Sequence, residues 1–323
     1  MEVADPVPEI SVVIPLYQRA HLIGATIRSV LEQTFQGFEI IVIDDGSTDD
    51  PAAAIASIGD ARARLLSFGN AGASAARNRG IDAARGRFVA LLDSDDAFLP
   101  HHLATMHELV TRNPGKIAYC PVIADRGAGV AIVKPSAAKR PDETMAEYLM
   151  CNRGFVQTSG VVLPTEIARA VRYREDTSFG DDTDFAIRLE LAGHGFVMAE
   201  RPGVIWFDLP DPRRLSADLP DRFPMRWLED LRPHITKRAY LAYMGWHGAK
   251  GLMKRHLLKA IRAYLAAVLG GAYDFRVALV VFAQVFIPNG LYRRLADGFI
   301  KLRRRPPDHF AALPHSPAGR LSS

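Results

Sequence analysis

The sequence predicts an α/β protein with a mainly parallel central sheet, followed by a basic helical region. Three observations support this prediction. Short apolar runs alternate with helical patterns through the first hundred residues, which is typical of β-α-β units. Two of the predicted strands run directly into clusters of aspartate. Residues 1–210 hold 20 Lys and Arg against 28 Asp and Glu, whereas residues 211–323 hold 20 against 8.

Four strands and three connecting helices are expected between residues 10 and 92. The strands are short apolar runs such as ISVVIP and FEIIVID, as in buried parallel sheets, and the helices have apolar residues at spacings of three and four. The strands are expected at residues 10–15, 38–44, 63–68 and 88–92, and the helices at residues 22–32, 49–58 and 73–84. Ligands bind at the carboxyl ends of such strands.

The rest of the chain is less regular. A helix is expected at residues 101–111, a strand at 117–124 and a loop at 127–140, followed by a mixture of short elements up to residue 210. From residue 220 the pattern is helical. A proline-rich tail from about residue 306 is expected to be mobile.

Composition indicates a globular chain with one sizeable domain and an appendage. Cys120 and Cys151 lack the spacing of a disulfide framework or a zinc site, which fits a reducing cytoplasm. The first nine residues lack the basic and apolar pattern of a secretory signal. The longest apolar run, residues 277–288, is shorter than the roughly 20 residues that a membrane-spanning helix needs. The chain is therefore not expected to cross a bilayer.

The sequence Asp93-Ser94-Asp95-Asp96 follows the strand expected at residues 88–92. Aspartate favours turns and helix N-caps, so a purely structural role is one interpretation. The other is that carboxylates two residues apart point the same way and hold Mn²⁺ or Mg²⁺, with ligand positions left for phosphate oxygens. A diphosphate leaving group needs such neutralisation of its charge.

Two further acidic motifs allow the same two interpretations. Asp44-Asp45-Gly46-Ser47 ends the second strand, where a carboxylate can cap the next helix or accept hydrogen bonds from a base or a ribose. Gly180-Asp181-Asp182 begins a short helix. Its carboxylates can stabilise the helix dipole, or one of them can act as a general base on an acceptor hydroxyl.

These motifs, in this order and spacing, resemble the nucleotide-binding half of family 2 glycosyltransferases with the GT-A fold. Each motif is weak alone, and the specificity comes from their order. The resemblance covers about residues 10–210. The motifs are VVIPLY at residues 12–17, DDGS at 44–47, ARN at 76–78, DSDD at 93–96, TSG at 158–160 and GDD at 180–182.

The resemblance implies an inverting enzyme that moves a sugar from a nucleotide-diphosphate sugar, with UDP-sugars favoured, to an acceptor hydroxyl. It further implies a saccharide or lipid-linked saccharide acceptor, in cell-envelope polysaccharide or glycolipid synthesis. Residues 1–210 would form the GT-A catalytic domain, with a nucleotide-binding half at about 10–125 and an acceptor half at about 140–210. Residues 211–323 would form the basic helical region.

Site roles follow from the same resemblance by position. Asp182 would be the catalytic base, with Asp181 beside it. The donor site would comprise Pro15, Tyr17, Asp44, Asp45, Arg77, Asn78, Asp93 and Ser94. The divalent metal would be held by Asp93, Asp95 and Asp96, and the acceptor by Thr158, Ser159 and Gly160.

The sequence departs from the family pattern at two positions. Gln18 stands where asparagine is common, and Asp181 replaces a more usual glutamate, so the base is either Asp181 or Asp182. The later part of the chain has no Q-x-x-R-W element, so the chain does not resemble processive polysaccharide synthases. Addition of one sugar per encounter is therefore expected.

Three other enzyme classes and one binding class compete with this interpretation. A sugar nucleotidylyltransferase needs a glycine-rich, arginine-bearing loop after the first strand, where Pro15-Leu16-Tyr17-Gln18 stands. The G-x-G-x-x-G motif of a dehydrogenase and the G-x-x-x-x-G-K-[ST] motif of a P-loop enzyme are absent. A non-catalytic nucleotide-sugar-binding protein stays open, because binding and catalysis share most of the site.

In the basic C-terminal third, Lys and Arg lie beside apolar residues at helical spacing, between residues 240 and 305. One interpretation is a solvated face of helices that pack on the catalytic domain. The other is an amphipathic surface that lies on anionic lipid, which would place a cytoplasmic protein at the inner face of the membrane. No nucleic-acid-binding motif or aromatic platform accompanies the charges, so no nucleic acid partner is expected.

Overall fold

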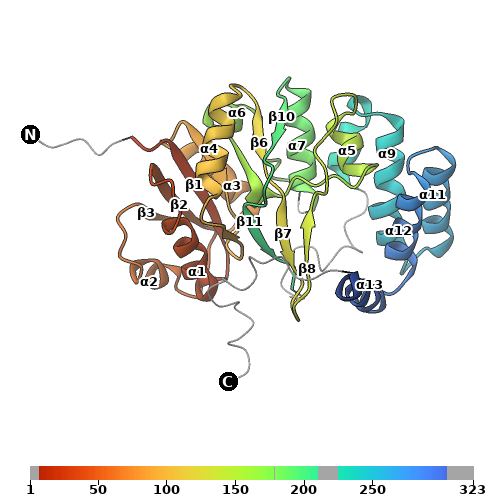
Figure 1. Cartoon of the computed structure of the whole chain (residues 1–323), viewed down its shortest axis with the longest axis horizontal. Helices are drawn as coiled ribbons and strands as arrows, with labels where there is room; N and C mark the ends of the chain where they lie inside the picture. Colours follow the sequence, from red (N-terminus) through yellow and green to blue (C-terminus); the bar gives the residue numbers. More distant parts are fainter. Residues whose placement is uncertain (1–6, 178, 210–224, 304–323) are drawn as a thin grey trace, which may run out of the picture. The chain divides into compact units, whose positions relative to one another are not determined.

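The computed structural model describes residues 7–177, 179–209 and 225–303 (Figure 1). These residues form two compact units. The first unit draws on residues up to 124 and on 133–138 and 156–207, and the second on 125–132, 139–155 and residues from 208 onward. The boundary expected between residues 210 and 211 and the tail expected from residue 306 lie outside the described residues.

The first unit is built on a seven-stranded sheet in the order β10-β6-β9-β4-β1-β2-β3. β1 pairs in parallel with β2 and β4, and β2 pairs in parallel with β3, whereas β9 runs antiparallel to β4 and β6. These strands are β1 (Ile10–Leu16), β2 (Phe38–Asp44), β3 (Ala63–Ser67), β4 (Phe88–Leu91), β6 (Ile117–Tyr119), β9 (Val161–Pro164) and β10 (Phe196–Met198). The four strands expected up to residue 92 are confirmed.

Helices flank this sheet because each presents one apolar face. α1 buries Ile23, Ile27 and Val30 at spacings of four and three, and each such side chain contributes about 1.5–3 kcal/mol when fully buried. α3 packs closely because Gly80 has no side chain: a Cβ there would lie 2.3 Å from Val13 Cγ1. The helices of this unit are α1 (Ala20–Leu31), α2 (Pro51–Ala56), α3 (Ala73–Ala83), α4 (His102–Arg112), α6 (Thr165–Val171) and α7 (Asp181–Leu191).

A second, four-stranded sheet has the order β5-β11-β7-β8 and corrects two predictions. Residues 117–124 are two strands in different sheets, because Pro121, which lacks a backbone N–H, follows β6. Residues 127–140 are not only loop, since β8 lies among the glycines and lysines that suggested one. The strands are β5 (Ala97–Phe98), β7 (Val122–Asp125), β8 (Ala131–Lys134) and β11 (Val204–Phe207).

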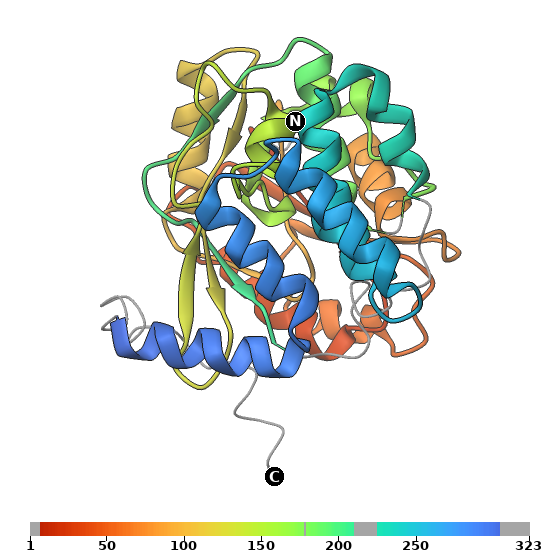
Figure 2. The ribbon, with the colours of Figure 1, turned by 90° about the vertical axis from the view of Figure 1, so that its right-hand side faces the viewer.

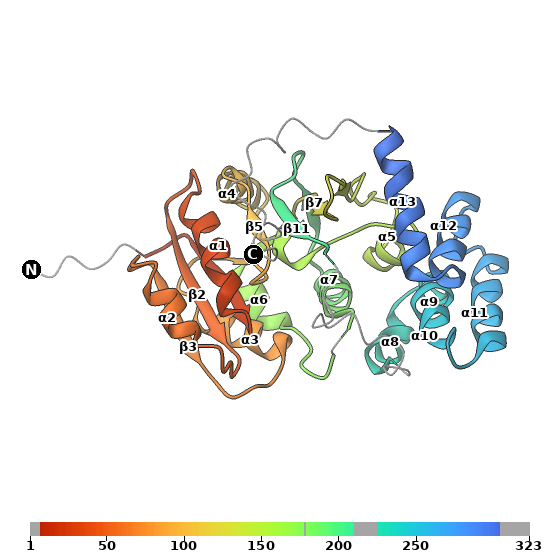
Figure 3. The same cartoon turned by 90° about the horizontal axis from the view of Figure 1, so that it is seen from below.

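The second unit is mainly helical, which confirms the expected helical C-terminal region. A π-helical turn at Met244–Gly248 joins α9 to α10, and Figure 3 shows α9 to α12 lying together. The helices are α5 (Met145–Met150), α8 (Arg226–Leu231), α9 (Lys237–Tyr243), α10 (Ala249–Leu252), α11 (Leu257–Leu269), α12 (Phe275–Phe286) and α13 (Asn289–Arg303). Among the described helices, none combines the length and the apolar character needed to span a bilayer.

Candidate active site

The carboxyl ends of β1, β2 and β4 bring three of the sequence motifs to one edge of the seven-stranded sheet. Leu16 and Asp44 are level in the parallel register, and the Asp45 N–H donates to the Leu16 carbonyl at 2.9 Å. On the other side of β1, the Leu92 N–H donates to the Val13 carbonyl at 3.0 Å. The residues that follow these strands therefore share one edge, where ligands of open α/β sheets bind.

Asp45 holds the loop between β3 and α3. Its two carboxylate oxygens accept hydrogen bonds from the N–H groups of Ala71 and Gly72 at 2.9 and 2.7 Å, and Arg79 lies 3.3 Å from one of them. Gly72 is the N-cap of α3, so the side chain fixes where this helix begins. Asp44 closes a local turn by accepting from the Ser47 N–H at 2.8 Å. Both aspartates lie at the predicted donor edge and are themselves buried.

The first strand ends in a more open segment. Pro15 is buried in β1 opposite Ile43, whereas Tyr17 is half exposed. Gln18 adopts a left-handed conformation with φ +53°, and its N–H donates to Ser47 Oγ at 3.0 Å. Of the donor residues predicted on this strand, Tyr17 therefore presents an accessible side chain and Pro15 shapes the backbone.

The Asp93–Asp96 turn separates its carboxylates into two environments. Asp93 and Asp95 keep about a quarter of their side-chain surface exposed and form ion pairs with Arg77 and Arg19, respectively. Asp96 is buried, and one of its oxygens accepts hydrogen bonds from Ser159 Oγ at 2.6 Å and Gln157 Nε2 at 2.9 Å. Burial, together with the charges of Asp95 and Asp93, raises the pKa of the Asp96 carboxyl well above its usual range.

Ser159 ties this turn to the 3₁₀ turn at Thr158–Gly160. Its hydroxyl donates to Asp96 and accepts the Asp93 N–H at 3.0 Å, and the side chain is fully buried. Thr158 and Gly160 are also buried, and a Cβ at Gly160 would lie 3.1 Å from the Cys120 carbonyl oxygen. Ser94 is buried as well, and its carbonyl accepts from Thr26 Oγ1 at 3.0 Å. The predicted acceptor residues are thus buried against the predicted metal-binding turn, which Ser159 contacts directly.

We expect Ser159→Ala to lower the free energy of unfolding by about 1–3 kcal/mol, because it removes a hydrogen-bond partner from the buried Asp96 carboxyl and from the Asp93 N–H. Urea denaturation measures this loss. The control is Ser57→Ala, whose exposed hydroxyl donates only to the Ala54 carbonyl and whose loss should change the value by less than about 0.5 kcal/mol. Equal effects of the two variants would contradict a supporting role for Ser159.

Arg77 joins the Asp93–Asp96 turn to the start of α7. Its Nη2 lies 2.7 Å from Asp93 and its Nη1 lies 2.6 Å from Asp181, although the two carboxylates are 88 positions apart in the sequence. The guanidinium is buried and lies over the Tyr173 ring, 5.1 Å from its centroid. Burial disfavours its charge, but the two carboxylates outweigh that effect and raise the pKa of Arg77 above its ordinary value.

Asn78 anchors the segment that leads toward α7. Its side-chain amide donates to the Tyr173 carbonyl at 2.9 Å and to Glu175 at 2.8 Å, and its oxygen accepts the Tyr173 N–H at 2.8 Å. The two hydrogen bonds with Tyr173 are buried, and the one to Glu175 is partly buried. The sequence expectation placed Asn78 near the nucleotide, and the structure shows its hydrogen bonds directed to residues 173–175.

The two carboxylates that begin α7 differ in their partners. Asp181 pairs with Arg77, whereas Asp182 accepts hydrogen bonds from the N–H and the hydroxyl of Thr183 at 2.7 and 3.3 Å. Burial and the negative charge of Asp181 raise the pKa of Asp182 to about 7, against the opposite effects of Thr183 and Arg77. A carboxylate with a raised pKa is a stronger base than an ordinary one.

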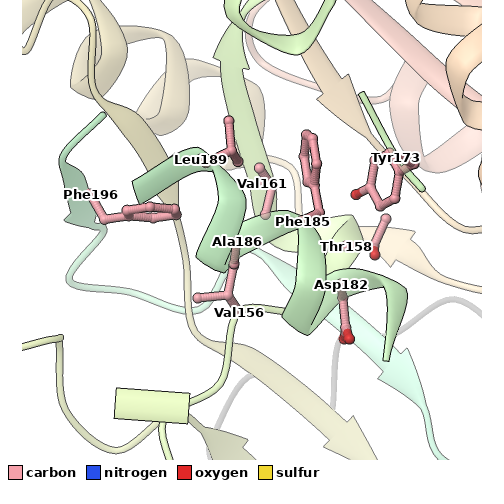
Figure 4. Close-up of a pocket in the computed structure, with 9 residues that line it drawn as sticks. All are labelled: Val156, Thr158, Val161, Tyr173, Asp182, Phe185, Ala186, Leu189 and Phe196. Carbon is pink, nitrogen blue, oxygen red and sulfur yellow. The ribbon is translucent and has the colours of Figure 1, made fainter. Parts of the chain in front are cut away.

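Asp182 also borders a small pocket beside α7. Figure 4 shows its carboxylate pointing away from the apolar side chains of this pocket. Thr158 and Tyr173 line the same pocket, so a residue of the TSG motif lies close to the start of α7. The remaining lining residues are Val156, Val161, Phe185, Ala186, Leu189 and Phe196.

The acidic turn offers two carboxylates, rather than three, to a divalent cation. Within the described part of the chain, no group of three or more His, Cys, Asp or Glu side chains is gathered as a ready metal site. Asp93 and Asp95 are accessible, and Mg²⁺ in phosphate-binding sites is often held by one or two carboxylates together with substrate phosphates. The two side chains fit such a site, and the buried carboxyl of Asp96 does not contribute an exposed oxygen.

Sequence reasoning did not identify four residues of this site. They are Arg19, which pairs with Asp95; Arg79, which reaches Asp45; Gln157, which donates to Asp96; and Tyr173, whose ring lies under Arg77. Arg19 could have been found, because it follows the first strand at the ligand-binding edge. Tyr173 and Gln157 have no local signal, since their neighbours come from distant parts of the chain.

Sequence comparisons connect this site with enzymes that transfer sugars. The model of the family "Glycosyl transferase family 2" matches residues 11–172. The amylovoran biosynthesis glycosyltransferase AmsB of Erwinia amylovora is 30% identical over 246 residues, which are 73% of this chain and 82% of AmsB. The UDP-Glc:alpha-D-GlcNAc-diphosphoundecaprenol beta-1,3-glucosyltransferase WfgD of Escherichia coli is 38% identical over 105 residues, which are 32% of this chain and 42% of WfgD.

Solved structures show the same fold at low sequence identity. Staphylococcus aureus TarS 1-349 in complex with UDP-GlcNAc has a TM-score of 0.61 and 18% identity, and the match covers 94% of this chain and 92% of that chain. The mannosyltransferase PcManGT from Pyrobaculum calidifontis, in complex with GDP-Man and Mn²⁺, has a TM-score of 0.56 and 18% identity, with 91% and 85% covered. The expected GT-A fold with a helical C-terminal region is confirmed.

Proposed function

Because this chain belongs to glycosyl transferase family 2 and is a glycosyltransferase, we propose that it moves a sugar from a nucleotide-diphosphate sugar to an acceptor hydroxyl with inversion. The observation that supports this most is the Arg77 guanidinium, which pairs with both Asp93 and Asp181. Through these two contacts, the Asp93 turn, where the diphosphate would leave, lies next to the start of α7, where the base would act. A non-catalytic sugar-binding protein is set aside by the family membership.

Asp182 is the general base in this proposal. Asp181 is held in an ion pair with Arg77 at 2.6 Å, while Asp182 has no such ion pair among the described residues and has a raised pKa. The acceptor oxygen attacks the anomeric carbon, its proton passes to the Asp182 carboxylate, and the bond from that carbon to the phosphate oxygen breaks. The nucleoside diphosphate leaves with the bonding electrons. One displacement inverts the anomeric centre.

The donor side follows from the strand edge. Tyr17 offers an exposed ring to the base, and Asp44 and Asp45 support the backbone that would face the base and ribose. Asp93 and Asp95 would hold a divalent cation, Mn²⁺ or Mg²⁺, which supplies positive charge to the diphosphate when bound. We assign Asp96, together with Ser159 and Gln157, to positioning the turn.

We propose a UDP-sugar as the donor and a saccharide or lipid-linked saccharide as the acceptor. WfgD is named for a UDP-glucose donor and a GlcNAc-diphosphoundecaprenol acceptor, and AmsB for amylovoran biosynthesis. TarS was crystallised with UDP-GlcNAc. These names support cell-envelope polysaccharide or glycolipid synthesis. We further propose a cytoplasmic enzyme that attaches peripherally to the inner face of the membrane.

We expect kcat to fall as the pH drops through about 7, because Asp182 must be ionised to accept the proton and burial with the Asp181 charge raises its pKa to about 7. The rate should reach a plateau above that value. This fall in rate toward low pH, the acidic limb, is measured by a pH profile of kcat at saturating donor. Asp181→Asn removes the charge that raises this pKa, so the limb should move to lower pH. An unchanged limb in that variant would contradict the assignment.

A donor screen tests the proposed function. Thermal shift and donor hydrolysis are measured with UDP-, GDP- and dTDP-sugars, with and without Mn²⁺ or Mg²⁺, for the wild type and for Asp95→Ala. Stabilisation by one nucleotide class that needs the cation and is lost in Asp95→Ala would support the donor site and identify its base. The absence of any response in the wild type would overturn the proposal. Glu108→Ala, an exposed surface carboxylate, is the control.

A further inference from the structure

The second unit exposes many large apolar side chains on three consecutive helices. Of the fourteen large apolar residues that are exposed in the described part of the chain, ten lie between residues 257 and 299. Leu269 is 85% exposed and Phe275 is 78% exposed. Isolated exposed apolar residues are ordinary, but a concentration of them on neighbouring elements indicates an interaction surface.

The exposed residues recur at helical spacing. In each helix they are separated by three, four or seven positions, so they form one stripe. Ala260 and Ala267 of α11 and Ala278, Val281 and Val285 of α12 are buried instead. The stripes are Leu258, Leu265 and Leu269 on α11, Phe275, Leu279 and Phe282 on α12, and Leu291, Leu295 and Phe299 on α13. We call these nine residues the apolar stripes.

The three helices pack against one another by other contacts. The Tyr264 ring of α11 lies 5.7 Å from that of Phe282 and 5.5 Å from that of Phe286, and its hydroxyl donates to the Ala278 carbonyl at 3.0 Å. Gln284 of α12 donates to the Tyr292 hydroxyl of α13 at 3.0 Å. Figure 2 shows α11, α12 and α13 next to one another, facing the viewer. Phe282 therefore takes part in this packing with one side of its ring, and it and the other stripe residues still expose about half or more of their surface.

Positive charge accompanies the stripes. Residues 250–303 contain ten Lys and Arg but only two acids, Asp274 and Asp297. Asp274 caps α12 by accepting the Val277 N–H at 2.7 Å, and Asp297 lies 3.1 Å from Arg126. The exposed cations on or beside the three helices are Lys254, Arg255, Lys259, Arg262, Arg276, Arg294 and Lys301. A partner of this surface must therefore accept apolar side chains and carry negative charge.

We propose that the apolar stripes and these cations dock on an anionic phospholipid membrane, with the three helices lying in the plane of the interface. Amphipathic helices of this composition insert their apolar side chains at the headgroup boundary, where Lys and Arg meet anionic headgroups. A second copy of the chain fits less well, because a two-fold dimer would place this basic surface against itself. This proposal rests on the peripheral membrane location proposed above and specifies which surface binds the lipid. It does not depend on the mechanism of sugar transfer.

The test measures binding of the full chain to vesicles of phosphatidylcholine alone and of phosphatidylcholine mixed with phosphatidylglycerol. We expect co-sedimentation with the anionic vesicles at low salt and release at high salt. Leu269→Ser with Phe275→Ser should reduce binding, as should Lys259→Gln with Arg262→Gln, by roughly fivefold for each cation removed. Leu191→Ser and Arg112→Gln, exposed residues of the first unit, are the matched controls and should bind as the wild type does.

Thermal unfolding of each variant shows whether it is folded, and donor binding to the wild type is measured separately, so failure of lipid docking is distinguishable from failure of the transferase. Wild type that stays in solution with anionic vesicles at low salt would overturn the proposal. Equal binding by the stripe variant, the cation variant and the controls would do the same. A concentration-dependent dimer that the stripe variant abolishes would identify a second copy as the occupant instead.

Discussion

Asp182→Asn is expected to lower kcat for sugar transfer by roughly 10²- to 10⁴-fold, because a positioned general base contributes about that much to a proton transfer. Asparagine keeps the shape of the side chain and can still accept the hydrogen bonds from Thr183. The donor should therefore bind within about threefold of the wild-type affinity, as is usual when a group acts mainly in the transition state. Steady-state kinetics and donor titration measure the two quantities.

Asp181→Asn is the matched control for this prediction. It changes the neighbouring carboxylate by the same atoms but leaves the proposed base in place, so it should lose much less activity than Asp182→Asn. The opposite order, with Asp181→Asn nearly inactive and Asp182→Asn active, would assign the base to Asp181. Weak donor binding by Asp182→Asn would show that the carboxylate belongs to the donor site instead.

Arg77→Met is expected to have the second largest effect, on both stability and activity. It leaves Asp93 and Asp181 without their shared cation, and removing one partner of a buried ion pair destabilises a protein by about 3–5 kcal/mol. Its absence also raises the pKa of Asp182 further, because the Arg77 charge lowers that pKa in the wild type. The loss of kcat toward low pH should therefore set in at a higher pH than in the wild type.

Arg77→Lys separates these effects. Lysine keeps the positive charge but cannot form two directed contacts with separate carboxylates as the guanidinium does. We expect a folded protein with kcat lowered by about 10²-fold, as small displacements of catalytic groups produce. Arg112→Met, which removes an exposed ion pair with Glu108, is the control and should be close to wild type in unfolding and rate. Wild-type kcat in Arg77→Lys would contradict the positioning role.

Local patterns predicted most of the first unit. The strands at residues 10–92 and their helices follow from apolar spacing, because each element buries one face against the same sheet. The strand expected at residues 117–124 was wrong because the apolar run continues through the point where the chain leaves one sheet for the other. β8 was missed because only four residues, Ala131–Lys134, form it, and glycine and lysine dominate the surrounding composition.

Most residues of the candidate site could be predicted from the sequence, but the contacts between them could not. Spacing alone identified Asp93 and Asp181 as separate motifs, and only the fold reveals that Arg77 lies within hydrogen-bond distance of both. The same holds for Asp96, whose sequence neighbours suggest a metal ligand while its spatial neighbours, Ser159 and Gln157, remove it from the surface. The roles of these residues in transfer stay predictions until the variants are measured.

Two consecutive residues of α3 bind the chain segment that leads into α7 and the first residue of α7. Asn78 holds it at Tyr173, and Arg77 holds it at Asp181. Both ends of the intervening stretch are therefore set by a helix whose own start is fixed by Asp45. In the proposed function this stretch lies beside the base, so insertions and substitutions there would change the surface offered to the acceptor while Arg77 still holds Asp181. Relatives with different acceptors are expected to diverge most in that stretch.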